Sequence, residues 1–244
     1  MFINTTYRTT QVEIMDDFEM EGEILQNALD KIAKINQLLG GNKLTLEGVK
    51  KLLDLHPPKQ KVTVVDVGCG NGDLLRVLAN YFDQKGLQCT LIGIDANKFT
   101  INYARKLSAH YPNISYRCED IFDKSFENLK YDIVLCTLTL HHFKDNEIIR
   151  LLKIFKDNAK IGIVINDLQR SGISYRLFQG LCFFFRLNVM SRKDGLVSIL
   201  RGFKKPELEA FSNKLNLKSY SIQWKWAFRY QWIINTKQEL NSAK

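Results

Sequence analysis

A strand that runs directly into a glycine-rich turn constrains the fold of this chain more than any other feature. Residues 62–73 read VTVVDVGCGNGD, in which four valines surround Asp66 and are followed by Gly68, Gly70 and Gly72. A continuous β-branched run is typical of a parallel strand that is buried on both faces. A helical pattern begins directly after the glycines. They therefore lie where a strand turns into a helix and where backbone can approach a ligand without a Cβ in the way.

The spacing of these glycines distinguishes between two kinds of cofactor. A dinucleotide-binding fingerprint requires a glycine at the position where this chain has Asp73. The pattern acid-x-Gly-x-Gly-x-Gly, which begins at Asp66, instead resembles motif I of the class I S-adenosylmethionine-dependent methyltransferases. The loop therefore favours a methyl-donor site over a nicotinamide site.

Length and composition predict one α/β core with additions. The chain has 244 residues, of which 45% are hydrophobic, enough for one sizeable core and too few for two. No window approaches the roughly 18 apolar residues that a membrane span requires, and the first residues lack the apolar stretch of a signal peptide, so we expect a cytoplasmic protein. The five cysteines are scattered without zinc-ligand spacing, so we expect reduced thiols and no metal site.

The excess positive charge is confined to the last third of the chain. From Arg170 to the end there are 14 Lys and Arg against 4 Asp and Glu, and the preceding part is close to neutral. Such an asymmetry can attract a nucleic acid, an acidic carrier protein or a membrane surface, or it can simply aid solubility. An acidic run that includes Glu13 and Asp16 lies near the other end, which suggests that the two ends meet.

From residue 62 onward, strands and helices alternate at lengths typical of a parallel, doubly wound α/β sheet. The expected strands are 62–67, 89–94, 114–118, 131–138 and 161–167, and the expected helices are 73–83, 98–109, 145–157 and 205–216. Two β-rich runs, 217–226 and 227–236, are joined by almost no loop and predict a terminal hairpin.

Additions flank this core. Helices are expected at 21–39 and from an N-cap at Thr45 to 55, so that residues 1–58 form a helical extension and 59–244 the main domain. Residues 170–204 form a long insertion, which we expect to be a lid. Within it, 173–187 is predicted to be an aromatic-rich helix, and Asp194 with Gly195 is predicted to form a turn.

Ligands in such a sheet bind beyond the carboxyl ends of the strands, so the residues that follow each strand are the candidate site. Asp95 ends the second strand, where a carboxylate can accept hydrogen bonds from both hydroxyls of a ribose. Asp120 follows the third strand, where it can take an adenine amino group while Ile121 packs on the ring. The fourth strand leads into Leu140-His141-His142.

With these positions in order, residues 62–236 resemble the class I S-adenosylmethionine-dependent methyltransferases. The Leu-His-His sequence is similar to that of small-molecule enzymes such as the quinone-biosynthesis methyltransferases, and the stretch after the fifth strand resembles enzymes of polyketide and pigment pathways. The resemblance implies a Rossmann-like, seven-stranded, mostly parallel sheet with an antiparallel last strand. It also implies S-adenosylmethionine as cofactor, S-adenosylhomocysteine as product, and a set of cofactor-binding positions: Asp66, Gly68, Cys69, Gly70, Gly72, Asp95, Ala96, Asp120, Ile121 and Thr137.

Four residues are candidates for chemistry on the acceptor. His141 and His142 follow the fourth strand, and an imidazole can take a phenolic proton at neutral pH, although either ring can instead pack locally. Asp167 follows the fifth strand and can act as a base or orient a histidine. Arg170 can clamp an anionic acceptor through its planar guanidinium.

The predicted lid indicates the kind of acceptor. Its three consecutive phenylalanines are expected to lie in the core or in the pocket: Phe183, Phe184 and Phe185. If they line the pocket, the acceptor is large, flat or apolar. The nearby arginines suit a carboxylate, a phenolate or a membrane surface. The expected function is methyl transfer to an oxygen of an apolar, aromatic small molecule, with a carbon as the second choice of acceptor atom.

Two alternatives to this function are an RNA methyltransferase and a non-catalytic S-adenosylmethionine-binding regulator or scaffold. Enzymes that methylate the amino groups of nucleic-acid bases usually carry Asn/Asp-Pro-Pro-aromatic after the fourth strand, which this chain lacks. None of its cysteines follows a proline, as the nucleophile of the cytosine C5 enzymes usually does. Nucleic acid is therefore disfavoured as a substrate, although the basic end of the chain can attract phosphate.

Overall fold

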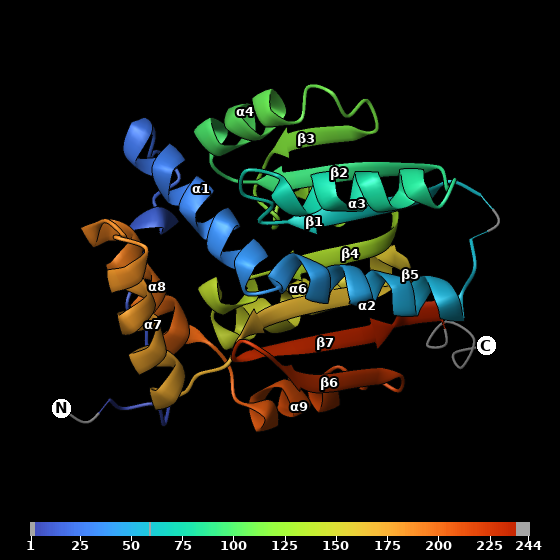
Figure 1. Ribbon diagram of the computed structural model, residues 1–244. Coiled ribbons are helices and arrows are strands. Elements are labelled where there is room, and N and C mark those ends of the chain that lie inside the picture. Colours follow the sequence, from blue (N-terminus) through green and yellow to red (C-terminus); the bar gives the residue numbers. More distant parts are fainter. Residues whose placement is uncertain (1–2, 59, 238–244) are drawn as a thin grey trace.

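The fold is a seven-stranded sheet between two layers of helices, seen in a computed structural model that describes residues 3–58 and 60–237 (Figure 1). The strand order is β3-β2-β1-β4-β5-β7-β6, and β7 runs antiparallel to both of its neighbours. This confirms the predicted sheet, its antiparallel last strand and its terminal hairpin. The strands are β1 (Val62–Val67), β2 (Cys89–Asp95), β3 (Ile114–Cys118), β4 (Tyr131–Thr137), β5 (Ala159–Leu168), β6 (Tyr220–Lys225) and β7 (Arg229–Asn235).

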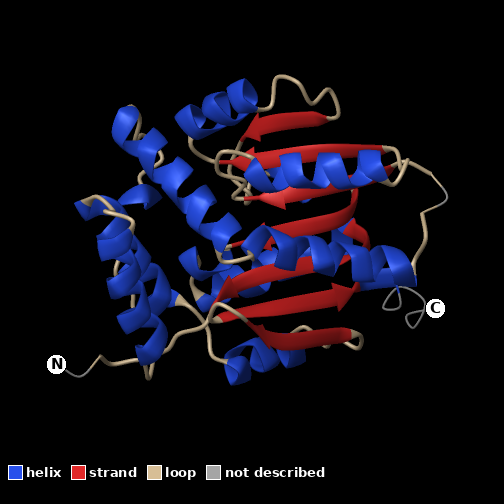
Figure 2. Cartoon of the chain, viewed as in Figure 1, coloured by secondary structure: helices blue, strands red, loops and turns tan. Residues whose placement is uncertain are grey.

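Helices cover both faces of the sheet, and each face buries its own apolar cluster (Figure 2). On one face lie α2 (Gly41–Leu55), α3 (Asp73–Gln84) and α4 (Lys98–Leu107), whose leucines and Phe82 pack on the even-numbered residues of β1. On the other lie α6 (Asp145–Asn158) and α9 (Lys205–Lys214), with the short α5 (Lys124–Glu127) beside them. Burial on both faces explains why the strands read as continuous apolar runs.

The chain reverses its direction across the sheet between β1 and β4. From β1 it proceeds outward to β2 and β3, and it then crosses back to β4 and β5 on the other side. At such a switch point the connections diverge and leave a crevice beyond the carboxyl ends of the strands. The glycine turn after β1 lies at this crevice.

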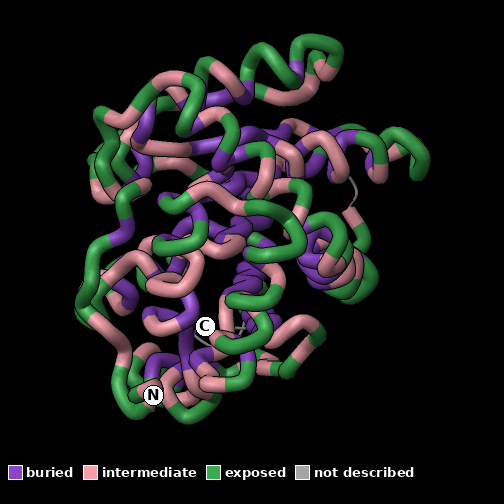
Figure 3. The backbone as a smooth tube through the Cα atoms, turned by 60° about the vertical axis from the view of Figure 1, so that its left-hand side comes forward, coloured by how far each residue is buried: buried purple, intermediate pink, exposed green. Residues whose placement is uncertain are grey.

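Segments from both ends of the insertion and from the N-terminus gather over these strand ends. They are the 3-10 turn η1 (Ile14–Asp16), helix α1 (Glu23–Leu38) and the antiparallel helices α7 (Gly172–Phe184) and α8 (Val189–Arg201), on the left of Figure 1. In Figure 3 this side comes forward and consists mainly of exposed and half-buried backbone, with the buried strands behind it. None of the described helices is long and apolar enough to cross a membrane.

Two local predictions were wrong. Helix α2 begins at Gly41, so Thr45 lies inside it and is not an N-cap. The Thr45 hydroxyl instead lies 3.0 Å from the hydroxyl of Thr137 and accepts a hydrogen bond from Asn166 Nδ2, which joins α2 to the strand ends.

The second wrong prediction concerned the expected turn at Asp194 and Gly195, because both residues lie within α8. Gly195 lets α8 approach α7 closely, since a Cβ there would lie 2.3 Å from the Phe178 ring. Asp194 is buried and accepts hydrogen bonds from the backbone N–H groups of Ile14 and Met15, so it holds η1 against α8.

A substitution at Gly72 tests how tightly the turn after β1 is packed. Its φ is +76°, and a Cβ would lie 2.0 Å from the hydroxyl of Tyr116, which is buried and bonded to Ser108. We expect Gly72→Ala to lower the free energy of unfolding by roughly 2 to 4 kcal/mol, since it adds overpacking to backbone strain. Urea denaturation measures this loss.

Gly86→Ala is the matched control, because Gly86 also has a positive φ (+63°) but has open space around its Cβ position. It should cost only about 1 to 2 kcal/mol. Equal losses for the two variants would contradict close packing at Gly72.

Candidate active site

A cavity of about 1120 Å³ lies beyond the carboxyl ends of β1, β2, β4 and β5. Its other walls come from residues 7–18, from α1, from α7 and α8, and from the turn between β6 and β7. This volume slightly exceeds the range of about 300 to 1,000 Å³ that is typical of small-molecule sites, so one cavity can hold a cofactor and a second molecule. Of the ten predicted cofactor positions, nine line it: Asp66, Gly68, Cys69, Gly70, Asp95, Ala96, Asp120, Ile121 and Thr137. Gly72 lies just outside, as the N-cap of α3.

The glycine turn brings backbone to the cavity wall. Gly68 and Gly70 have φ values of +69° and +52°, which glycine adopts without strain. A Cβ on Gly68 would also lie 2.3 Å from Oγ1 of Thr139, so the turn packs directly against the segment after β4. The Gly68 N–H donates to the carbonyl of Ile94 at 2.8 Å, which fixes the turn to the end of β2.

Two of the strand-end acids, Asp95 and Asp66, differ in their hydrogen-bond partners. Asp95 accepts backbone hydrogen bonds from Asn97 (3.0 Å) and Gly70 (3.2 Å), while burial raises the pKa of its carboxyl. Asp66 is buried, and its Oδ1 has no hydrogen-bond partner among residues 3–58 and 60–237. Burial, reinforced by Asp73 and Asp95, raises the Asp66 pKa well above its usual value. A ligand with a hydrogen-bond donor or a positive charge would relieve Asp66.

Asp120 and Ile121 form the far end of the same wall, after β3. Ile121 is buried and presents an apolar surface, whereas Asp120 is exposed and accepts a hydrogen bond from the backbone of Phe122 at 2.9 Å. The structure thus brings the predicted positions after β1, β2, β3 and β4 together around one cavity.

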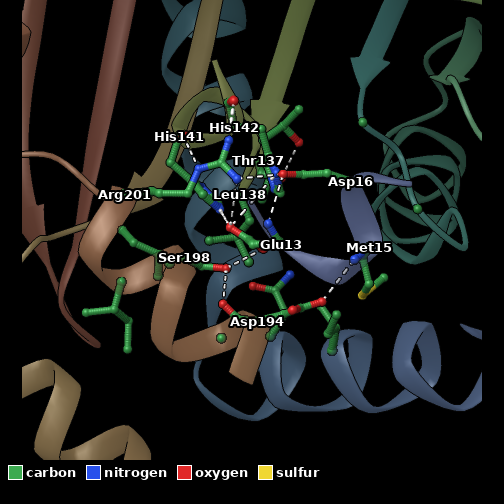
Figure 4. A pocket seen from close by; sticks show the side chains of 18 of the residues that line it. Glu13, Met15, Asp16, Thr137, Leu138, His141, His142, Asp194, Ser198 and Arg201 are labelled. Carbon is green, nitrogen blue, oxygen red and sulfur yellow. Dashed lines mark hydrogen bonds and ion pairs between the residues drawn. The ribbon is translucent and has the colours of Figure 1, made fainter. Parts of the chain in front are cut away.

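His141 is held between two carboxylates, those of Asp167 and Glu13. Figure 4 shows His141 beside Glu13 and His142. Its Nδ1 lies 2.7 Å from Oδ1 of Asp167, and its backbone N–H donates to Oδ2 of the same residue. On the opposite side, Nε2 lies 3.6 Å from Oε1 of Glu13, and both atoms are buried without a hydrogen-bond partner in the described chain. The bond to Asp167 orients the ring and leaves Nε2 directed toward Glu13 and the cavity.

The charges of this group favour a protonated imidazole. Burial alone would lower the His141 pKa, but Asp167 and Glu13 outweigh it and raise that pKa to about 9. Both carboxylates have lowered pKa values, because the attraction of the histidine exceeds the effect of their own burial. In this arrangement, His141 is an imidazolium at neutral pH.

His142 faces a separate acidic group on η1. Its Nδ1 lies 2.5 Å from Oδ1 of Asp16, whose Oδ2 accepts a hydrogen bond from Nη1 of Arg201 at 2.6 Å. Arg201 belongs to α8, so Asp16 links the N-terminal segment to the insertion and to the segment after β4. The expected meeting of the acidic run and the basic end of the chain is confirmed at this point.

Glu13, His141 and His142 also place three ligand-type atoms within 4.8 Å of one another. Such a group can hold a metal ion, which the sequence did not lead us to expect. The guanidinium of Arg201 lies 3.6 Å from Oε1 of Glu13 and already supplies positive charge to that carboxylate. We therefore interpret the three side chains as a charged group that Arg201 stabilises, and assign no metal to them.

Arg170 is placed differently from the anion clamp that the sequence suggested. It is buried outside the cavity lining, and its guanidinium donates to both carboxylate oxygens of Glu207 on α9 and to the carbonyls of Thr5, Thr6 and Gly202. These bonds join the N-terminal segment to the ends of the insertion, so Arg170 supports the fold.

The phenylalanines of α7 also differ from expectation. Phe183 and Phe184 are 81% and 84% exposed, so they belong neither to the core nor to the cavity lining. The α7 residues that reach the cavity are Leu177, Phe178 and Leu181. Periodicity alone does not separate the two faces of a helix that is apolar on both.

Comparisons with known proteins bear on the family and the fold of the chain. Residues 58–174 match a family described as a methyltransferase domain. A malonyl-acyl-carrier-protein O-methyltransferase of Acetivibrio thermocellus is 29% identical over 129 residues, which are 51% of this chain and 41% of that protein. A ubiquinone biosynthesis O-methyltransferase of Coxiella burnetii is 31% identical over 91 residues, 37% of this chain and 36% of that protein. The chain thus spans less than half the length of these curated relatives.

Among solved structures, the plantazolicin methyltransferase BpumL in complex with S-adenosylhomocysteine superposes with a TM-score of 0.66. The two chains share 18% identity, and the match covers 87% of this chain and 93% of BpumL. At this identity the likeness shows the fold alone. The resemblance to class I small-molecule methyltransferases is confirmed by these comparisons together.

The raised pKa of His141 predicts a specific dependence of stability on pH. A group whose pKa is higher in the folded state contributes stability fully below its unfolded pKa and loses that contribution as pH rises through its folded pKa. For His141 the window lies between the ordinary value of 6.5 and about 9. The free energy of unfolding of the wild type should fall by roughly 3 kcal/mol more than that of His141→Gln across this range.

Urea denaturation at a series of pH values from 6 to 10 measures this difference. Parallel pH profiles for the wild type and His141→Gln would contradict a charged histidine between Glu13 and Asp167.

Proposed function

We propose that this chain, which carries a methyltransferase domain of the class I fold, transfers a methyl group from S-adenosylmethionine to an oxygen of an apolar small molecule. One observation carries the proposal: the strand-end positions Asp66, Asp95 and Asp120 line the same cavity as Glu13 and His141, and the His141 ring is held from behind by Asp167. The cavity has room for both cofactor and acceptor.

The residues of the cavity fit S-adenosylmethionine. The unpartnered Oδ1 of Asp66 suits the amino group of the methionine part, and Asp95 suits the ribose hydroxyls. Ile121 offers an apolar surface for the adenine, with Asp120 beside it for the amino group. The glycine turn admits the chain of the cofactor to close approach with backbone.

When bound, S-adenosylmethionine supplies a methyl group that is activated by the positive charge of its sulfur. The protein then has to position the acceptor, exclude water and manage the proton of the acceptor. The roof of the cavity, made by residues 7–18 with α1, α7 and α8, serves the exclusion of water. Apolar side chains of α1 and α7 suit an acceptor with an apolar body.

Glu13 and His141 suit an oxygen as the acceptor atom. A hydroxyl oxygen beside both Nε2 and Oε1 can accept a hydrogen bond from the imidazolium and donate one to the carboxylate, which would satisfy the two buried atoms that lack partners in the described chain. The imidazolium N–H donates to that oxygen, while the Glu13 carboxylate accepts the proton of a phenolic hydroxyl. A carboxylate acceptor has no proton to lose, and the imidazolium neutralises its charge.

Asp95→Ala tests the cofactor assignment. Asp95 is expected to hold the ribose, so we expect the variant to bind S-adenosylhomocysteine at least tenfold more weakly, since a charge-assisted hydrogen bond contributes about 1.5 to 3 kcal/mol. Calorimetric titration measures the affinity.

Asp83→Ala, an exposed change near the end of α3, should bind like the wild type. A wild-type protein that fails to bind S-adenosylhomocysteine would remove the basis of the proposed function.

Glu13→Gln tests the role of the buried pair in catalysis. For catechol and quinol acceptors we expect kcat to fall about 10²- to 10⁴-fold, because the proton acceptor is lost. Hydroxylated aromatic acids that are methylated on the carboxylate should be affected much less. Radiolabelled methyl transfer to a library of these compounds measures both effects, with S-adenosylhomocysteine affinity as a check on folding.

Ser198→Ala is the matched control, because Ser198 donates to Oε2 of Glu13 without changing its charge. It should retain most of the wild-type rate. Undiminished turnover of phenols by Glu13→Gln would exclude this role, and methylation of structured RNA with none of the library would exclude a small-molecule acceptor.

A further inference from the structure

Arg229 is a buried cation, and no ion-pair partner for it lies in residues 3–58 and 60–237. It stands at the start of β7, is 3% exposed and lines the cavity. Its Nη1 donates to Oδ1 of Asn36 at 2.8 Å, and its Nε is buried without a hydrogen-bond partner in residues 3–58 and 60–237. Within the same residues, no carboxylate lies within the 4.0 Å of an ion pair.

The other buried arginines near the strand ends, unlike Arg229, each have an ion-pair partner. Arg170 is paired with Glu207, and Arg201 is paired with Asp16. Burial lowers the pKa of Arg229 to about 10, and the distant charge of Asp167 only partly opposes this effect. A buried charge without a partner is unfavourable, so a group that supplies negative charge to Arg229 would be bound strongly.

The guanidinium lies against the first turn of α2. A Cβ on Gly41, the first residue of that helix, would lie 2.6 Å from Nη1 of Arg229, so only glycine permits this approach. The N-cap is Gly40, which has no side chain to cap the helix, and the first turn contains no acidic residue. The backbone N–H groups and the dipole of a 15-residue helix therefore add positive potential at the same point.

A chain of amides fixes the guanidinium in place. Asn36 on α1 donates to Asn42 on α2, and Asn42 donates in turn to Oδ2 of Asp73 at 2.6 Å. These contacts leave Asn36 Oδ1 as an acceptor for Arg229. Asn36, Asn42 and Arg229 all line the cavity, so the positive group is held rigidly at its wall.

We propose that Arg229 and the N-terminus of α2 form a carboxylate-binding site in this cavity. A carboxylate accepts two parallel hydrogen bonds from a guanidinium and is also the charge that a helix N-terminus favours. The identity of the ligand rests on the proposed function, which offers two carboxylates. One is a carboxylate on the acceptor, and the other is the carboxylate of the methionine part of the cofactor.

Arg229→Met, which removes the charge and keeps most of the length, tests the site with two pairs of probes. S-adenosylhomocysteine is compared with methylthioadenosine, which lacks the amino acid, and 4-hydroxybenzoate is compared with its neutral amide. Calorimetry measures each affinity. Within each pair, the affinity for the probe with the carboxylate is divided by the affinity for the probe without it. If the variant lowers this ratio at least tenfold for the first pair, the site binds the cofactor; if it does so for the second pair, the site binds the acceptor.

Asn36→Asp provides a second test that leaves Arg229 in place. It puts a carboxylate beside Nη1 and should reduce the same ratio at least tenfold. Arg192→Met, an exposed change on α8, should leave both ratios unchanged. If Arg229→Met does not fold, Asn36→Asp decides the outcome.

Ratios that stay within twofold of the wild type in a folded variant would overturn the carboxylate site. This result is distinct from a failure of the proposed function, in which the wild type binds neither S-adenosylhomocysteine nor methylthioadenosine. In that event the comparison of 4-hydroxybenzoate with its amide still tests the site by itself.

Discussion

The closure of the cavity depends on His141, which is held between Glu13 and Asp167. Asp167 belongs to β5, an inner strand of the sheet, whereas Glu13 belongs to a segment that precedes every helix and strand of the core. A protonated histidine attracts both carboxylates and so draws the N-terminal segment onto the strand ends. Asp16 and Arg201 extend the same link to α8, so charged contacts join the N-terminal segment, the segment after β4 and the insertion.

Glu13 and His141 therefore serve both the proposed binding of the acceptor and the stability of the roof. Asp194 holds η1 to α8, and Arg170 holds the residues before η1 to α9, so the roof has ties that do not use the histidine. A ligand that competes with His141 for Glu13 therefore loosens one contact among several. Binding can rearrange the centre of the site without releasing the whole N-terminal segment.

Much of the sheet and of the cofactor side of the cavity could be predicted from local sequence. Alternating strands and helices fixed the strand ends, and topology places every parallel strand end at the same edge, so Asp66, Asp95 and Asp120 could be brought together without coordinates. The acceptor side could not be predicted in this way. Glu13 and His141 are 128 positions apart in the sequence. The only indication that the N-terminal segment contacts distant parts of the chain was the opposite charge of the two chain ends.

The errors share a physical cause, which is that residue type does not reveal the partner of a buried polar group. Arg170 and Arg229 are both arginines at strand ends, and the former was the more obvious anion clamp because it follows β5 directly. The structure gives Arg170 a carboxylate from α9 and leaves Arg229 with an amide. Which arginine is free for a ligand is thus decided by the residues that fold around it. A cation that its own chain leaves unpaired at a cavity wall is where the charge of a ligand contributes most to binding.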